Sequence, residues 1–145
     1  MNEKKFHVGI KALVQNDKNE ILVLKINPKE LTNNKHGVYW DLPGGRIKEG
    51  DSVEQTLQKE LEEEIGYIGH IKNVNLFHGS IASIEIPVGE EKFGLVLFVY
   101  SCKIKMGKIK LSEEHTDYKW ASLKDAKKLL AVKFSKDFIE RLDSL

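Results

Sequence analysis

The segment Ser52–Gly66 constrains the fold more than any other part of this chain, because it carries both the start and the stop signals of a helix. Ser52, with Gln55 three residues later, matches a capping box, and Gly66 stands where a C-terminal cap belongs. An α-helix advances roughly 100° per residue, so side chains that share a face can be identified from their spacing. One apolar stripe, which we expect to face the core, spans about 80° of this helix. It contains Val53, Leu57 and Leu61.

The same helix carries four carboxylates in the run KELEEEIG, and two of them share the apolar face. With Val53 at zero, Glu60 lies at about 340° and Glu64 at about 20°, whereas Glu63 flanks the stripe at about 280° and Glu62 points away at about 180°. Carboxylates turned toward a core are costly, and neighbours at this spacing repel one another. A hard divalent cation, Mg²⁺ or Mn²⁺, resolves both problems. The alternative is a helix end that splays into solvent and pairs with nearby lysines.

A glycine turn precedes the helix and favours the metal interpretation. Gly44 and Gly45 allow the backbone to approach a ligand closely, and a glycine carbonyl can bind a hard metal ion. Arg46 and Lys48 could bind phosphate oxygens, so we expect them to contact substrate together with Gly45. The alternative is a plain glycine-rich turn with solvated basic side chains.

Strand and helix signals alternate along the rest of the chain. Phe6–Val14 has strand periodicity, and Ile21–Ile26 reads as its hairpin partner across the turn Asn16–Asn19. The continuously apolar Leu95–Tyr100 is typical of a central strand covered on both faces. Strands interleaved with three helices predict an α/β domain with helices packed on a mixed sheet. Further strands are expected over 71–77, 82–86 and 117–120, and further helices from Ser122 through Leu130 and over 134–142.

The spacing from Gly45 to Tyr67 resembles the Nudix box: Gly45, five residues, Asp51, seven residues, then KELEEEIGY. The flanking stretches VYWDLPGG and EEHTDYKWASLKDA are also similar to those of Nudix proteins. The resemblance covers nearly the whole chain. It implies a Nudix-type α/β/α sandwich with a mixed β-sheet, in a single Nudix hydrolase domain over residues 1–145.

The resemblance also implies an activity and the residues that perform it. Similar proteins use Mg²⁺, with Mn²⁺ as an alternative, to hydrolyse a nucleoside diphosphate linked to another moiety. The carboxylate that takes a proton from the attacking water is left open among Glu60, Glu64 and Glu114. Lys59 occupies the place of the arginine that orients the catalytic glutamate. By position the implied metal ligands are Glu60, Glu63, Glu64, the Gly44 carbonyl and Glu114, which resembles the extra glutamate outside the box and has Glu113 and Glu85 as weaker rivals.

Three positions depart from the family pattern. Asp51 replaces Glu, Lys59 replaces Arg, and Tyr67 replaces the closing aliphatic residue. Lysine offers a point charge instead of a planar fork, so a looser orienting contact is expected. No departure removes a metal carboxylate, and the site is therefore expected to be intact.

Substrate marks downstream of the box are absent, including those of the ADP-ribose, dinucleoside polyphosphate, coenzyme A and NADH groups. By elimination we expect a nucleoside triphosphate pyrophosphohydrolase, with oxidised nucleotides as one candidate class of substrate. Two other hydrolase activities stay open, one toward ADP-ribose or nucleotide sugars and one toward dinucleoside polyphosphates. Isopentenyl diphosphate isomerase and a non-catalytic nucleotide-binding domain are the remaining alternatives.

Composition bounds the partners. The net charge of +1, from 23 Lys and Arg against 22 Asp and Glu, gives no broad basic surface for nucleic acid or membranes. The N-terminus lacks a signal-peptide block, no run reaches membrane-spanning length, and Cys102 has no second cysteine to pair with. We therefore expect a cytoplasmic protein whose partner is a small molecule, with a homodimer left open. His115, beside Glu114, is expected in a surface loop.

Overall fold

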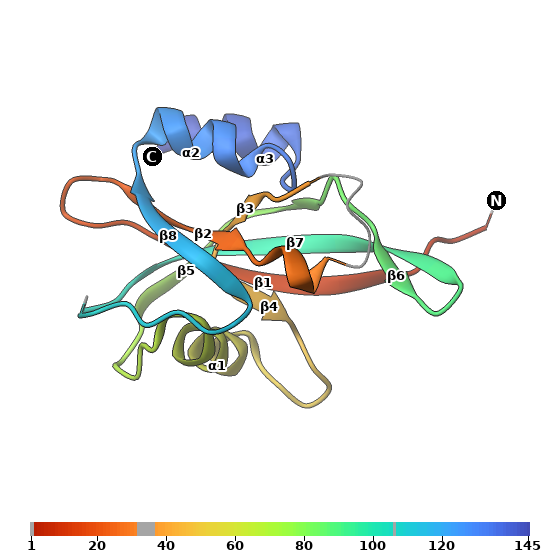
Figure 1. Cartoon of the computed structure of the whole chain (residues 1–145), viewed down its shortest axis with the longest axis horizontal. Helices are drawn as coiled ribbons and strands as arrows, with labels where there is room; N and C mark the ends of the chain where they lie inside the picture. The colour runs from red at the N-terminus through yellow and green to blue at the C-terminus, as the bar shows by residue number, and fades with distance from the viewer. Residues whose placement is uncertain (1, 32–36, 106) are drawn as a thin grey trace.

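Two β-sheets form the centre of the molecule and helices cover them on both sides (Figure 1). A computed structural model describes residues 2–31, 37–105 and 107–145. Helix α1 (Val53–Ile65) lies on one side, and α2 (Leu123–Leu130) and α3 (Lys136–Arg141) lie on the other. No helix within the described residues is long and apolar enough to span a bilayer. The strands are β1 (Phe6–Val14), β2 (Ile21–Ile26), β3 (Trp40–Asp41), β4 (Gly44–Arg46), β5 (Lys72–Ile81), β6 (Ile86–Val88), β7 (Glu91–Lys103) and β8 (His115–Ala121), with short 3₁₀ turns at Pro28–Glu30 and Leu142–Ser144.

The larger sheet is mixed, as the sequence predicts. Its order is β4-β1-β7-β5, and β6 pairs with the first residues of β7, 91–93. Strands β1 and β7 run parallel, and the other pairs are antiparallel. A second, antiparallel sheet has the order β3-β2-β8. The predicted α/β class is confirmed, with the strands divided between two sheets.

The predicted hairpin of the first two strands is wrong in its pairing, although both strands lie where they were expected. Beyond one isolated bridge between Gln15 and Ile21, β1 and β2 belong to different sheets. The two strands therefore separate just after the turn. Because β1 is covered on both faces, every residue from Gly9 to Val14 is buried, so the alternation of residue types does not separate core from solvent.

The segment 82–86 does not form the expected strand. The amide of Ala82 donates to the Leu95 carbonyl and the amide of Ser83 donates to the Lys133 carbonyl. The second of these bonds holds the segment against the loop between α2 and α3. The next strand along the chain is β6, which begins only at Ile86. Strand β5, by contrast, continues to Ile81, beyond its predicted end at Phe77.

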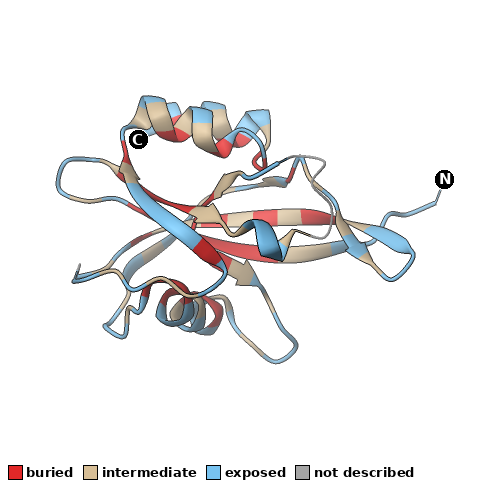
Figure 2. Ribbon diagram, viewed as in Figure 1, coloured by how far each residue is buried: buried red, intermediate tan, exposed pale blue. Residues whose placement is uncertain are grey.

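Helix α1 has the predicted ends. Ser52 and Gln55 form the reciprocal capping box, and Gly66 closes the helix in the left-handed region at φ 73°. Its apolar stripe packs into a core cluster with β1 and β2, and the other cluster lies under α2 and α3, where Phe134 and Phe138 are fully buried. Figure 2 shows both buried layers on the two sides of the sheets.

Candidate functional site

The carboxylate of Glu64 is buried between helix α1 and the glycine turn. The residue is 4% exposed, and its Oε1 accepts a 2.7 Å hydrogen bond from the Gly44 amide. Burial raises the pKa of Glu64 to about 8, although the Lys11 charge and the Gly44 hydrogen bond lower it. Glu60 is half-buried and Glu62 is exposed, which confirms the distribution of charge predicted by the helical wheel.

Glu60 lies directly against the second glycine of the turn. A β-carbon at Gly45 would overlap the Glu60 carboxylate, so only glycine fits here without displacing that side chain. Burial and the negative charges of Glu63 and Glu114 raise the pKa of Glu60, while Lys11 and Lys48 lower it. Three carboxylates thus act on one another at this end of the helix, and Lys48 lies close enough to influence them.

His115 and Glu114 complete this cluster from the start of β8. The closest ligand atoms of Glu64, Glu114 and His115 all lie within 4.8 Å of one another. Nδ1 of His115 is 3.8 Å from Oε2 of Glu64 and has no hydrogen-bond partner in the described structure. Burial lowers the pKa of His115, which favours a neutral ring with a free lone pair.

This donor set fits a divalent cation. Carboxylate oxygens suit Mg²⁺ and Mn²⁺, and an imidazole nitrogen is a further acceptable ligand for Mn²⁺. A buried ring nitrogen without a partner costs free energy, and a metal ion would supply the missing interaction. Ionisation of Glu64 in its buried position would likewise be stabilised by a cation.

Lys11 is buried behind the turn and ties it to β1. Its Nζ donates to Asp41 Oδ2 at 3.0 Å and to the carbonyls of Leu42 and Gly44 at 3.3 Å each. Burial lowers the pKa of Lys11, but the charges of Asp41 and Glu64 raise it above its ordinary value. The Gly44 carbonyl, a predicted metal ligand, therefore already accepts a hydrogen bond from an ammonium group.

Asp41 forms ion pairs with two buried lysines, because Lys133 also donates a hydrogen bond to its Oδ2. Burial alone would raise the pKa of Asp41, but the charges of Lys11 and Lys133 lower it to about 2. Burial lowers the pKa of Lys133 to about 8 despite the opposing charge of Asp41. Together the three groups form a buried ion cluster beneath the turn.

Lys59 lies apart from the carboxylate cluster. Its Nζ is 2.9 Å from Asp51 Oδ2 and its side chain is largely exposed. Two departures from the family pattern, Asp51 and Lys59, are thus each other's ion-pair partners. The structure brings Lys59 to Asp51, and its predicted contact with a catalytic glutamate is not among the interactions seen.

The other predicted residues divide between the site and its surroundings. Arg46 lines a recess of about 170 Å³ together with Gly45, Lys11 and Lys133. Of the rivals to Glu114, Glu113 is exposed and its carbonyl accepts from Asn27, and Glu85 pairs with Lys4.

Four residues of this region were not predicted from the sequence as part of the site. His115 was expected in a surface loop but is buried. Lys11 lies in the apolar strand segment GIKALV. A lysine among apolar residues can indicate a buried charge, but the alternating strand pattern alone treats it as a solvent-facing residue. Asp41 and Lys133 carry no local signal, because their pairing joins segments 92 positions apart.

The NUDIX domain family model matches residues 5–142. The chain therefore belongs to the NUDIX domain family, whose box here contains Gly45 of the glycine turn and the α1 carboxylates Glu60, Glu63 and Glu64.

Relatives of known structure or curated function agree with this membership. The nucleoside triphosphatase NudI of Escherichia coli is 26% identical over 89 residues, which are 59% of this chain and 63% of NudI. The match thus spans less than two thirds of that relative's length. The crystal structure of a MutT protein from Methanosarcina mazei has a TM-score of 0.68 at 26% identity, covering 99% of this chain and 97% of that one. The dihydroneopterin triphosphate pyrophosphohydrolase of E. coli, at 16% identity and a TM-score of 0.70, covers 98% and 97% and shows the shared fold.

Proposed function

We propose that this chain is a Nudix pyrophosphohydrolase that requires a divalent cation and acts on nucleoside triphosphates. The observation that carries the proposal is the placement of Glu64, Glu114 and the unpartnered Nδ1 of His115 within 4.8 Å of one another, beside the glycine turn. Family membership supports the hydrolase class, and the acidic cluster supports a cation.

Glu64, Glu114 and His115 would hold the cation, with Glu60 and Glu63 adjacent on α1. When bound, a divalent ion would neutralise diphosphate charge and make a water molecule more acidic. Glu60, Glu64 and Glu114 remain the candidates for the group that takes the proton from that water. For Glu64, Oε1 accepts a hydrogen bond from the Gly44 amide, which leaves Oε2, on the His115 side, to hold the cation.

The chain's own cations would bind the phosphates. Arg46 and Lys48 follow the turn and are exposed, so they can reach the oxygens of a substrate that lies over Gly45. Lys11 stays behind the turn, where it fixes the carbonyls of Leu42 and Gly44 and positions the backbone. Lys59 would act on the site only through Asp51.

The preference for a nucleoside triphosphate rests on the absent substrate marks and on the name of the NudI relative. Its test is a substrate panel: nucleoside triphosphates including 8-oxo forms, ADP-ribose, nucleotide sugars and dinucleoside polyphosphates. Pyrophosphate and orthophosphate are quantified with Mg²⁺, with Mn²⁺ and with chelator. We expect cation-dependent pyrophosphate release from triphosphates.

Other results would identify an alternative. Preferred release from ADP-ribose, a nucleotide sugar or a dinucleoside polyphosphate would replace the substrate class. Isomerisation of isopentenyl diphosphate without hydrolysis would replace the reaction. Nucleotide binding with no turnover across the panel would make the chain a non-catalytic binding domain.

A further inference from the structure

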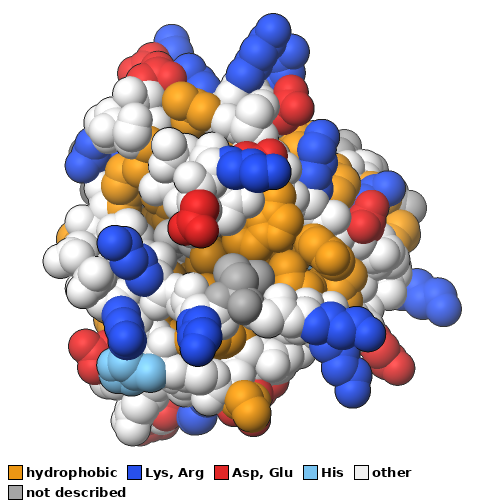
Figure 3. Space-filling model, turned by 90° about the vertical axis from the view of Figure 1, so that its left-hand side faces the viewer, with side chains coloured by type: hydrophobic (Ala, Val, Ile, Leu, Met, Phe, Trp, Pro, Cys, Tyr) orange, Lys and Arg blue, Asp and Glu red, His pale blue; other side chains and the backbone are white. Residues whose placement is uncertain are grey.

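A second hollow lies beyond the C-terminal end of α1, between the loop that leads into β5 and the loop that leaves β7. Its volume is about 730 Å³, within the range of small-molecule sites, which is roughly 300 to 1,000 Å³. One wall is apolar, formed by the Tyr67 ring and four isoleucines: Ile65, Ile68, Ile104 and Ile109. Figure 3 shows the face of the molecule that carries these loops, on which basic side chains lie among hydrophobic and acidic ones.

Tyr67 joins the two loops. Its hydroxyl donates to the His70 carbonyl at 2.6 Å and accepts from the Lys105 amide at 3.3 Å. A β-carbon at Gly69 would meet the Tyr67 ring, so the loop is closely fitted to this side chain. The tyrosine that departs from the family pattern therefore builds the hollow.

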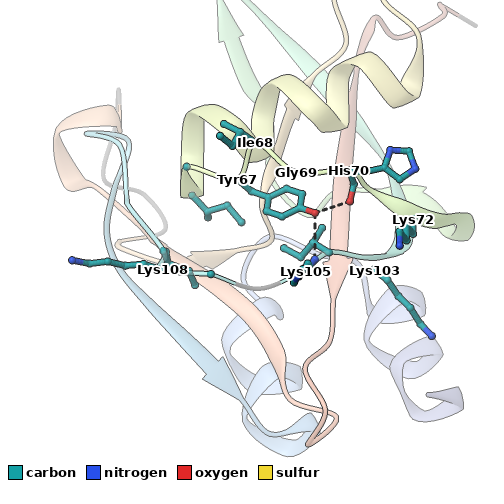
Figure 4. Close-up of a pocket in the computed structure, with 13 residues that line it drawn as sticks. Tyr67, Ile68, Gly69, His70, Lys72, Lys103, Lys105 and Lys108 are labelled. Carbon is teal, nitrogen blue, oxygen red and sulfur yellow. Dashed lines mark hydrogen bonds between the residues drawn. The ribbon is translucent and has the colours of Figure 1, made fainter.

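The charge around the hollow has one sign. Four lysines and one histidine line it, and no carboxylate does. None of the four ammonium groups has an ion-pair partner among the described residues, whereas Lys59 and Lys127 each have one. In Figure 4, Lys72 and Lys103 lie on the His70 side of the Tyr67 ring, and Lys108 lies on the opposite side. The lining cations are Lys72, Lys103, Lys105 and Lys108.

The C-terminus of α1 opposes an anion here, but weakly. A helix end carries roughly half a negative charge, against four lysine charges around the hollow. Three carbonyls near this end also accept hydrogen bonds: Leu61 from the Tyr67 amide, Glu62 from the Gly66 amide and Ile65 from the Lys110 amide. The four ammonium groups therefore decide the sign of the local potential.

We propose that this hollow is a second nucleotide site, which binds the polyphosphate chain of a nucleoside polyphosphate on its lysines and the base on its apolar wall. Flexible lysines suit a chain of phosphates, because each acts as a mobile point charge. The Tyr67 ring and the isoleucines offer the surface that a planar base needs. The site is separate from the carboxylate cluster and needs no divalent cation.

The test is calorimetric titration of the chain in EDTA, where cation-dependent binding at the carboxylate cluster is suppressed. The probes are ATP, inorganic tripolyphosphate and adenosine. The variant K72E/K103E/K108E reverses three charges at the hollow. The matched control K124E/K128E/K136E makes the same change in net charge at exposed lysines of α2 and α3.

We expect ATP to bind more tightly than tripolyphosphate, with adenosine weakest, and affinity to fall as salt is added. The hollow variant should lose at least tenfold in ATP affinity, while the control variant and Glu64→Gln change it less than twofold. Absence of ATP binding, or an equal loss in the control variant, would overturn the site. Equal affinity for ATP and tripolyphosphate would overturn the role of the apolar wall.

Discussion

The backbone amide of Gly44 donates a 2.7 Å hydrogen bond to Oε1 of Glu64, which fixes a carboxylate of α1 to a turn 20 positions earlier in the chain. The Gly44 carbonyl accepts from Lys11 on β1. Helix, turn and strand are thus joined through one glycine, and the second oxygen of Glu64 is left facing His115. The geometry of the carboxylate cluster therefore depends on backbone contacts as much as on the box glutamates.

Replacement of the buried carboxylate should abolish most turnover without unfolding the chain. Glu64→Gln keeps an oxygen for the Gly44 amide but removes the negative charge, so we expect kcat to fall roughly 100-fold or more at saturating Mg²⁺. The measurement is steady-state pyrophosphate release, with thermal unfolding followed in parallel. Glu62→Gln, on the exposed face of the same helix, is the control and should retain activity. Near-wild-type turnover of Glu64→Gln would remove Glu64 from the site.

His115 is expected to contribute to cation binding. His115→Ala removes the buried nitrogen that lacks a partner, and we expect Mn²⁺ affinity to fall by about tenfold. Calorimetric titration of Mn²⁺ measures this directly, with His7→Ala on β1 as a control outside the cluster. Unchanged Mn²⁺ affinity in His115→Ala would show that the ring only packs beside the carboxylates.

Gly45→Ala tests the close approach of turn and helix. The added methyl group would meet the Glu60 carboxylate, so that side chain must move. We expect a loss of about 1 to 3 kcal/mol in the free energy of unfolding, together with reduced turnover. Chemical denaturation and initial rates measure the two effects. Gly45 has no positive φ, so its loss would come from the overlap, whereas Gly89→Ala, at a glycine with a positive φ and open space around it, measures backbone strain alone. Unchanged stability and turnover in Gly45→Ala would contradict the overlap.

The buried ion cluster predicts a pH dependence of stability. The folded pKa of Asp41, about 2, is below its ordinary 3.8, so the stability from its ion pairs is present above pH 3.8 and lost as pH falls toward 2. Lys133 has a folded pKa of about 8 against 10.5. The unfolded chain therefore binds more protons between those values, and stability should rise with pH across that interval.

Asp41→Asn should remove the acidic transition and destabilise the chain by about 3 to 5 kcal/mol at pH 7, because two buried ammonium groups lose their counterion. Urea unfolding from pH 2 to 10 measures both effects. Asp125→Asn breaks an ion pair of half-exposed side chains and should cost less than about 1 kcal/mol. A loss in Asp41→Asn no larger than in Asp125→Asn would contradict a buried cluster that stabilises the turn.

Local signals in the sequence predicted most of the elements. The capping box at Ser52 and the glycine at Gly66 gave the ends of α1 correctly, because each acts through neighbouring backbone groups. The pairing of β1 was not predictable in this way, since periodicity contains no information about which distant strand lies alongside. The burial of Lys11 and His115 follows from partners brought together only in the folded chain.

The parallel pairing of β1 with β7 affects how the molecule is made. It runs in register from Phe6 beside Gly94 to Val14 beside Cys102. A chain emerging from the ribosome exposes its first apolar strand long before the neighbour that covers it has been synthesised. Such distant contacts slow folding and prolong exposure to aggregation. During translation this strand therefore stays open to chaperone binding until β7 has been synthesised.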